Sequence, residues 1–429
     1  MFGFANFLLL ALFAAAVFDL IFALARGGGL RGALHGLWNT PHLLFGQQLA
    51  EWRLQLGRIL FAAGLAAYEI SVVFCNSMAR QNWAWVQGVM SPVLEWLAFL
   101  CFGAKILFGT RYTWRELQAG GALYFIARWV YFNSQNIWWI GIVVAVLAAK
   151  DIPLCRPLQV YFASGCAAMA VVLALHFAGI VAPDLTSERM GALRGTYGYG
   201  HPNTFGGLVF GLVLAYALLR AQKVRWVDCL LVFAVGVFLL VGPASRSAAL
   251  CTLALAVGLV FCRLRAGHSV PRWWPGTCAG MVGLTAAVSY LLPLLVIKVG
   301  PWNNDIGPAW LAKLDSLLTC RISLTWMAYR LLDVKIAGQV FNWPTVDNSF
   351  AFALFQFGPV VAVLLGILFA AALWGHAKQG RRVEVCCLFA MLAYAYMEVQ
   401  PFHLTTNPTA LLLCGAVFAQ ASARWQKIE

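Results

Sequence analysis

Long apolar runs recur along the chain, and short polar connections separate them. Each run is continuous rather than alternating, which is typical of helices in lipid, where no water is present to pair with backbone groups. A hydrocarbon core of ~30 Å takes about 20 apolar residues as helix. The pattern predicts thirteen helical spans, at 4–25, 58–78, 91–110, 118–133, 136–150, 157–182, 204–220, 226–242, 246–264, 275–298, 348–374, 383–399 and 407–422.

Two of these predicted spans are short. Residues 118–133 and 136–150 are expected either to cross as two helices or to form a tight hairpin that does not fully cross. The first span, 4–25, contains Asp19, whose carboxylate would be costly where it faces lipid. The expected fold is an all-α integral membrane protein, one polytopic domain over residues 1–429 with about 12–13 transmembrane helices.

Composition supports lipid as the main solvent. The chain is 62% hydrophobic and 11% charged, against about 25% charged residues in soluble domains. A membrane β-barrel is excluded because it needs short alternating segments. The net charge of +14 does not indicate nucleic acid, since no basic run with interleaved aromatic residues is present. The 12 cysteines form no CxxC pair, which favours packing over disulfides or a metal site.

Lys and Arg alternate between rich and poor connections. Cytoplasmic loops are enriched in these residues, so the connections on the cytoplasmic side are predicted to be 26–53, 111–115, 150–156, 220–225, 263–272, 378–382 and the C-terminus. The connections 183–203 and 299–347 then lie on the extracytoplasmic side. The second is the one large external loop, and it is expected to contain a helix-like stretch around Leu311–Leu332.

A glycine-rich stretch precedes the predicted span 204–220. Residues 194–206 read Arg-Gly-Thr-Tyr-Gly-Tyr-Gly-His-Pro-Asn-Thr-Phe-Gly. Asn203 is expected to be the N-cap of the helix that follows, and a helix N-terminus at the membrane surface is an anion site. A simple cap on a glycine-rich loop explains the stretch equally well, and a lone His201 is more often structural.

Two further motifs place arginines on the same predicted side. Ser245-Arg246-Ser247 opens the span 246–264, where Arg246 either binds a ligand or extends to the membrane interface. Arg321 and Trp326 belong to the large loop and lie within about a turn and a half of each other if that stretch is helical. The alternative is an amphipathic helix that lies on the membrane.

The last two motifs supply carboxylates. Asp347-Asn348-Ser349 opens the span 348–374, and Asp347 or Asn348 is expected to cap that helix. Glu398 ends the span 383–399 on the same side, where its alternative is an interfacial turn residue. All five motifs therefore fall on one predicted face beside lipid. Arginines and carboxylates in that setting indicate a site for an anionic, lipid-linked substrate.

These stretches resemble the O-antigen ligase and polymerase superfamily, and more closely its polysaccharide repeat-unit polymerases of the capsular or exopolysaccharide type. The resemblance covers roughly residues 58–422 and is short at each motif. The matching segments are 194–206, which looks like the family's Gly-Phe-Gly-x-Pro-Asn; 245–247, like its Ser-Arg-Gly; Arg321 with Trp326 and Gly338, like its Arg-x-x-x-Trp and Gly-x-Gly; and 347–349, where ligases carry a catalytic His followed by Asn.

The resemblance implies a metal-independent inverting glycosyltransferase of the GT-C type, with no cofactor. Such an enzyme works on undecaprenyl-diphosphate sugars at the extracytoplasmic face of the inner (plasma) membrane, with a flippase and a chain-length regulator as partners. The resemblance implies that Arg246 and Arg321, helped by Arg194, bind the diphosphate, and that the supporting residues are Asn203, Ser245, Asn348 and Trp326.

The position of the ligase histidine is occupied here by Asp347, which disfavours a ligase and leaves the catalytic base open between Asp347, His201 and Glu398. The expected reaction moves a growing glycan from its polyprenyl diphosphate onto a lipid-linked repeat unit. One alternative is a ligase that transfers the finished glycan to a lipid or protein acceptor. Another is a transporter of the same lipid-linked glycan, which would place ionisable residues near the bilayer midplane on broken helices.

Overall fold

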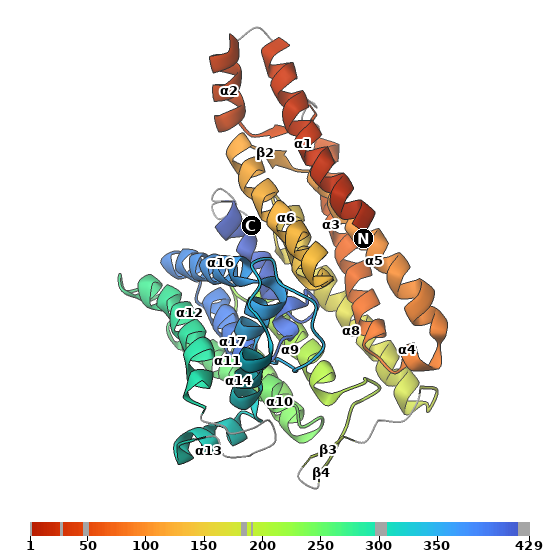
Figure 1. The fold of residues 1–429 in the computed structure, drawn as a ribbon, viewed down its shortest axis with the longest axis vertical. Coiled ribbons are helices and arrows are strands. Elements are labelled where there is room, and N and C mark those ends of the chain that lie inside the picture. The colour runs from red at the N-terminus through yellow and green to blue at the C-terminus, as the bar shows by residue number, and fades with distance from the viewer. Residues whose placement is uncertain are drawn as a thin grey trace. The chain divides into compact units, whose positions relative to one another are not determined.

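The computed structural model describes residues 2–25, 29–45, 51–181, 187–189, 192–296 and 307–418. Helices dominate these residues, as predicted, and the four strands form two short antiparallel pairs. Figure 1 labels the helices and strands along the chain. The chain divides into two compact units. Unit 1 comprises residues 1–128, 140–208 and 410–429, and unit 2 comprises residues 129–139 and 209–409.

Unit 1 contains the N-terminal helices and both strand pairs. Its core is α3, which packs against α5 and α8. The chain just after α5 approaches α3 closely, because a Cβ at Gly109 would lie only 2.7 Å from the Cα of Gly57. The elements wholly or partly in this unit are α1 (Phe2–Ala25), α2 (Gly29–Asn39), β1 (His42–Leu43), α3 (Glu51–Cys75), α4 (Ala79–Asn82), η1 (Val86–Met90), α5 (Ser91–Phe108), β2 (Arg111–Tyr112), α6 (Trp114–Ser134), α7 (Ile137–Ala148), α8 (Cys155–Phe177), β3 (Ser187–Arg189), β4 (Ala192–Arg194), α9 (Pro202–Leu219), η5 (Pro408–Leu413) and α18 (Cys414–Val417).

Unit 2 is a second helical bundle, in which α11 packs against α10 and α17, and α12 packs against α16. The turn between α10 and α11 is short, so these two helices run antiparallel. The further elements of this unit are α10 (Trp226–Val241), α11 (Arg246–Leu264), α12 (Trp274–Leu291), η2 (Leu292–Leu295), α13 (Ala309–Leu317), α14 (Arg321–Leu331), α15 (Ser349–Phe352), η3 (Ala353–Phe357), α16 (Pro359–Lys378), α17 (Arg382–Met397) and η4 (Gln400–Phe402).

Each predicted span contains helix, and the apolar helices support a multi-pass membrane protein. Among the described residues, eight helices are long and apolar enough to cross a bilayer: Gly3–Ala25, Glu51–Cys75, Val86–Phe108, Cys155–Phe177, Pro202–Leu219, Arg246–Leu264, Trp274–Leu295 and Pro359–Lys378. Several of them expose large apolar side chains, for example Phe13 and Val257, as a lipid-facing surface requires.

The finer count of about 12–13 transmembrane helices stays a prediction. Of the remaining predicted spans, α7 has 12 residues, or ~18 Å at 1.5 Å per residue, which is too short to cross a core of ~30 Å alone. The helices α10 and η5–α18 are also apolar and short. Residues 419–422 of the last predicted span lie outside the described residues.

The prediction of one continuous helix over 348–374 is wrong. The span 348–374 is interrupted at Gly358, whose φ of 87° is left-handed and whose added Cβ would lie 2.1 Å from the Ile336 carbonyl oxygen. The helix-like stretch predicted around Leu311–Leu332 is confirmed. It consists of two helices, because Thr319 and Cys320 both adopt a left-handed φ of 62° between the end of α13 and the start of α14. The connection 299–347 is therefore partly helical over its described residues, and residues 299–306 lie outside them.

Candidate functional site

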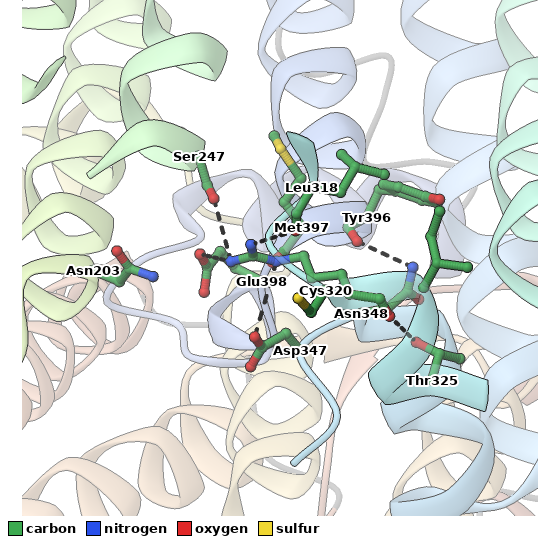
Figure 2. Close-up of polar contacts among 12 residues, drawn as sticks. Asn203, Ser247, Leu318, Cys320, Thr325, Asp347, Asn348, Tyr396, Met397 and Glu398 are labelled. Atoms are coloured by element: carbon green, nitrogen blue, oxygen red, sulfur yellow. Dashed lines mark hydrogen bonds and ion pairs between the residues drawn. The ribbon is translucent and has the colours of Figure 1, made fainter. Parts of the chain in front are cut away.

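The site in unit 2 is centred on Arg321, the first residue of α14, which is buried. Its Nη2 donates to Glu398 Oε1 at 2.5 Å and lies 3.4 Å from Ser247 Oγ. Figure 2 shows Ser247, Glu398 and Asp347 pointing toward this one guanidinium group. Asp347 Oδ2 lies 4.0 Å from Nε. One cation therefore holds two carboxylates at one place.

Arg321 also donates hydrogen bonds to backbone carbonyl groups. Nη1 donates to the Leu318 carbonyl at 2.9 Å, and Nε donates to the Met397 carbonyl. The guanidinium therefore ties the turn before α14 to the last residue of α17. Its planar, forked set of donors suits this arrangement, and the single ammonium of a lysine does not reproduce it.

The start of α15 fixes both carboxylates. Asn348 is the N-cap of α15 and accepts from the backbone N–H groups of Phe350 and Ala351, as one of the two predicted caps. Its Nδ2 donates to the Tyr396 carbonyl at 3.1 Å, and Ser349 Oγ donates to the Glu398 carbonyl at 2.6 Å. Asp347 directly precedes Asn348 and Ser349, and their two hydrogen bonds to the end of α17 hold the backbone of Asp347 beside it.

The two carboxylates differ in their exposure. The side chain of Asp347 is 30% exposed, and that of Glu398 is 7% exposed. Burial raises the pKa of Glu398, which follows the last residue of α17, to about 7; Arg321 lowers this pKa by less, and Asp347 raises it further. A substrate can therefore reach Asp347 more easily, whereas Glu398 is buried against its cation.

The Ser245-Arg246-Ser247 motif lies at the same end of α11. Arg246 is the first residue of the helix and is exposed, whereas Ser245 is buried and its Oγ has no hydrogen-bond partner among the described residues. Ser247 approaches Arg321. Arg321, Ser247, Asp347 and Glu398 are called the Arg321 cluster below. The exposed Arg246 is the sequence neighbour of Ser247, a member of this cluster.

The third predicted arginine, Arg194, lies in unit 1. Arg194 is buried, and its Nη2 donates to Asn203 Oδ1 at 2.9 Å. The backbone N–H of Asn203 donates to His201 Nδ1 at 3.1 Å, and the His201 ring is exposed. The prediction that Asn203 is the N-cap is wrong. The helix α9 begins at Pro202, because proline is favoured at the first helical position, so His201 takes the capping position.

Trp326 shares α14 with Arg321, as predicted, and packs against the buried residues Val296, Leu311 and Ile322. Its ring also lies under the Arg330 guanidinium at 5.8 Å. These contacts are those of a residue that holds α14 in place.

Sequence reasoning missed Asp315 on α13. Its carboxylate is fully buried and accepts from the first turn of α14. No group of three or more His, Cys, Asp or Glu side chains that could hold a metal ion occurs in the described part of the chain. All 12 cysteines are described and unbridged; Cys262 and Cys386 have their Sγ atoms 3.5 Å apart.

Comparisons of the chain with models of known protein families, with curated proteins and with solved structures found no match.

Proposed function

We propose that the protein is a polysaccharide polymerase of the cell membrane. It transfers a growing glycan from a polyprenyl diphosphate, such as undecaprenyl diphosphate, onto a lipid-linked oligosaccharide repeat unit at the extracytoplasmic face. The observation that carries the proposal is the buried Arg321 cluster, in which Glu398, Ser247 and Asp347 contact one guanidinium group. Its position next to helices of a membrane protein fits a substrate that is both anionic and attached to lipid.

The transfer is a single displacement with inversion. A hydroxyl oxygen of the acceptor sugar attacks the anomeric carbon of the donor chain, and the bond from that carbon to the diphosphate breaks. The bonding electrons leave with the diphosphate, and the hydroxyl proton passes to a base. Asp347 is the proposed base, because a carboxylate suits this step and its side chain is more exposed than that of Glu398.

The arginines bind the diphosphate and stabilise it as the leaving group. Arg246 is exposed and supplies a forked contact to the leaving diphosphate. Arg321 is buried; its Nη2, which faces Glu398 and Ser247, adds positive charge beside the leaving group, and its other donors hold the helix ends together. Arg194, His201 and Asn203 form the unit 1 cluster, which we propose to contact the lipid-linked substrate.

Transport of the same lipid-linked glycan is the second candidate, and one observation favours it. Glu69 on α3 is 1% exposed, and its Oε2 has no hydrogen-bond partner among the described residues. An isolated carboxyl group within a membrane helix is typical of transport pathways. A ligase remains a further alternative, which Asp347 disfavours because the matching ligase residue is a histidine.

One experiment separates these candidates. Purified protein in detergent is incubated with a synthetic polyprenyl-diphosphate repeat unit, and the products are resolved by length. A polymerase gives a ladder of products and free polyprenyl diphosphate. A transporter leaves the repeat unit unchanged, and a ligase forms product only when its lipid or protein acceptor is added.

A further inference from the structure

The first turn of α14 lacks an ordinary cap. The residue at its N-cap position is Cys320, which adopts a left-handed φ of 62° and makes no hydrogen bond from its side chain to the helix. Side chains that cap helices from this position are usually those of Ser, Thr, Asp or Asn. The free N–H groups at the start of α14 must therefore find another acceptor, because buried donors without one are costly.

Asp315 provides that acceptor from the preceding helix. Its Oδ1 accepts from the backbone N–H of Ile322 at 2.8 Å and of Ser323 at 3.1 Å. Its Oδ2 accepts from Ser323 Oγ at 2.8 Å. The backbone N–H of Cys320 also donates to the Asp315 carbonyl at 2.8 Å, which closes the turn between the two helices. A negative charge here is also favoured by the dipole of α14.

These bonds act directly beside Arg321. Arg321 is the first residue of α14, and the N–H groups of the next two residues, Ile322 and Ser323, donate hydrogen bonds to Asp315. Hydrophobic packing of Leu311 and Ile322 also joins the same two helices. Asp315 itself is 0% exposed, so it makes no contact with a substrate in solution or in lipid.

We propose that Asp315 is a positioning residue: its carboxylate fixes the first turn of α14 and thereby sets the Arg321 guanidinium against Glu398 and Ser247. This inference rests on the proposed function for its activity readout. Asp315 neither donates nor accepts a proton in the reaction. It acts through Arg321 alone.

The test compares Asp315→Ala with Asp315→Asn and with Asp333→Ala, a matched control that removes an exposed carboxylate from the same external loop. Asp315→Ala is expected to lower kcat by about 10²-fold, the cost of misplacing a catalytic group by about 1 Å, with little change in KM. Asp315→Asn keeps an oxygen that accepts from both N–H groups, so it should retain most activity. Loss of activity in the Asn variant equal to that in the Ala variant, with both folded, would contradict a role that rests on these hydrogen bonds.

Two further measurements make the inference specific. Arg321→Lys combined with Asp315→Ala should be no slower than Arg321→Lys alone, because residues that act as one unit are not additive; additive losses would refute it. Ser323→Ala removes the Oγ contacts with Asp315 Oδ2 and with the Cys320 carbonyl, leaves both backbone bonds to Asp315 Oδ1 in place, and serves as a milder variant. If Asp315→Ala does not fold, the same non-additivity with Arg321→Lys is required of Ser323→Ala.

Amide hydrogen exchange gives a readout that needs no activity. The amides of Ile322 and Ser323 should exchange faster in Asp315→Ala than in the wild type, and at the wild-type rate in Asp315→Asn and Asp333→Ala. Unchanged exchange in a folded Asp315→Ala protein would contradict the proposed role. A wild-type protein that transfers no glycan would refute the proposed function, whereas the exchange measurement would still decide whether Asp315 fixes the turn.

Discussion

Arg321 Nη2 and Glu398 Oε1 lie 2.5 Å apart, although 77 positions separate the two residues along the chain. The contact joins the first residue of α14 to the residue after α17. Nε of the same side chain lies 4.0 Å from Asp347, so one cation contacts both carboxylates. A buried carboxylate that loses its cation is strongly destabilised, so this pair is expected to be sensitive to substitution of either partner.

Arg321→Lys and Arg246→Lys should both lose most activity although the charge is kept. A point charge reproduces neither the several contacts of Arg321 nor a two-pronged contact of Arg246 with a diphosphate. The expected loss is about 2–4 kcal/mol of transition-state stabilisation for each, the scale of removing one preorganised donor. Steady-state kinetics with a lipid-linked repeat unit measure this loss.

The matched control is Arg265→Lys, which changes an exposed arginine directly after the end of α11 that is remote from the site. This control should keep normal turnover. Normal turnover in Arg246→Lys and Arg321→Lys at wild-type expression would reduce these residues to structural anchors.

The catalytic base is predicted to be Asp347. Asp347→Asn keeps the size of the side chain, and Asn348 still caps α15, so the variant should fold, bind substrate and be inactive. Its comparison variants are His201→Ala and Glu398→Gln, each assayed for turnover and for substrate binding. Normal polymerisation by Asp347→Asn, together with an inactive His201→Ala or Glu398→Gln, would assign the base to one of those residues.

The stability of the protein should depend on pH through Glu398. The folded state raises the pKa of this group from 4.5 to about 7, mainly by burial. The folded state therefore holds the proton more tightly than the unfolded state, and this contribution to stability falls as the pH rises from about 4.5 to about 7. Thermal unfolding of the wild type and of Glu398→Gln, compared at pH 5 and pH 7.5, measures it. The wild type should lose stability relative to the Gln variant; an unchanged difference would contradict a raised pKa.

Much of the fold follows from the sequence because lipid imposes long apolar helices. The break at Gly358 does not follow, because apolar residues continue through it and its cause is the close approach of Ile336, which the pattern of the segment does not reveal. The division of the stretch Leu311–Leu332 into α13 and α14 could not be predicted either. Thr319 and Cys320 rarely mark a left-handed turn, which glycine usually occupies.

The candidate site was partly predictable for a similar reason. Ser247, Asp347 and Glu398 stand at the ends of predicted spans, where polar groups beside lipid are conspicuous. Arg321 stands inside the predicted helix-like stretch Leu311–Leu332, and the structure brings these four residues together. Asp315 was missed because a capping signature is sought at the residue that precedes a helix. Its carboxylate caps α14 across a turn from another helix.

The predicted sidedness can be tested with two native cysteines. Cys155 and Cys320 are both exposed, and the charge pattern of the loops places Cys155 in the cytoplasm and Cys320 outside. In variants that retain only one of them, a membrane-impermeant maleimide added to intact cells should modify Cys320 and spare Cys155. Both should react after the membrane is opened. Modification of Cys155 in sealed cells, or protection of Cys320, would reverse the orientation.

The central claim is that this chain alone polymerises lipid-linked repeat units. The most direct measurement incubates the purified wild type and Asp347→Asn with a synthetic polyprenyl-diphosphate repeat unit in detergent and resolves the products by length. The account predicts a ladder of lengthening glycans, with one polyprenyl diphosphate released for each bond formed, from the wild type and none from Asp347→Asn. An unchanged repeat unit with folded wild-type protein that still binds it would contradict the account.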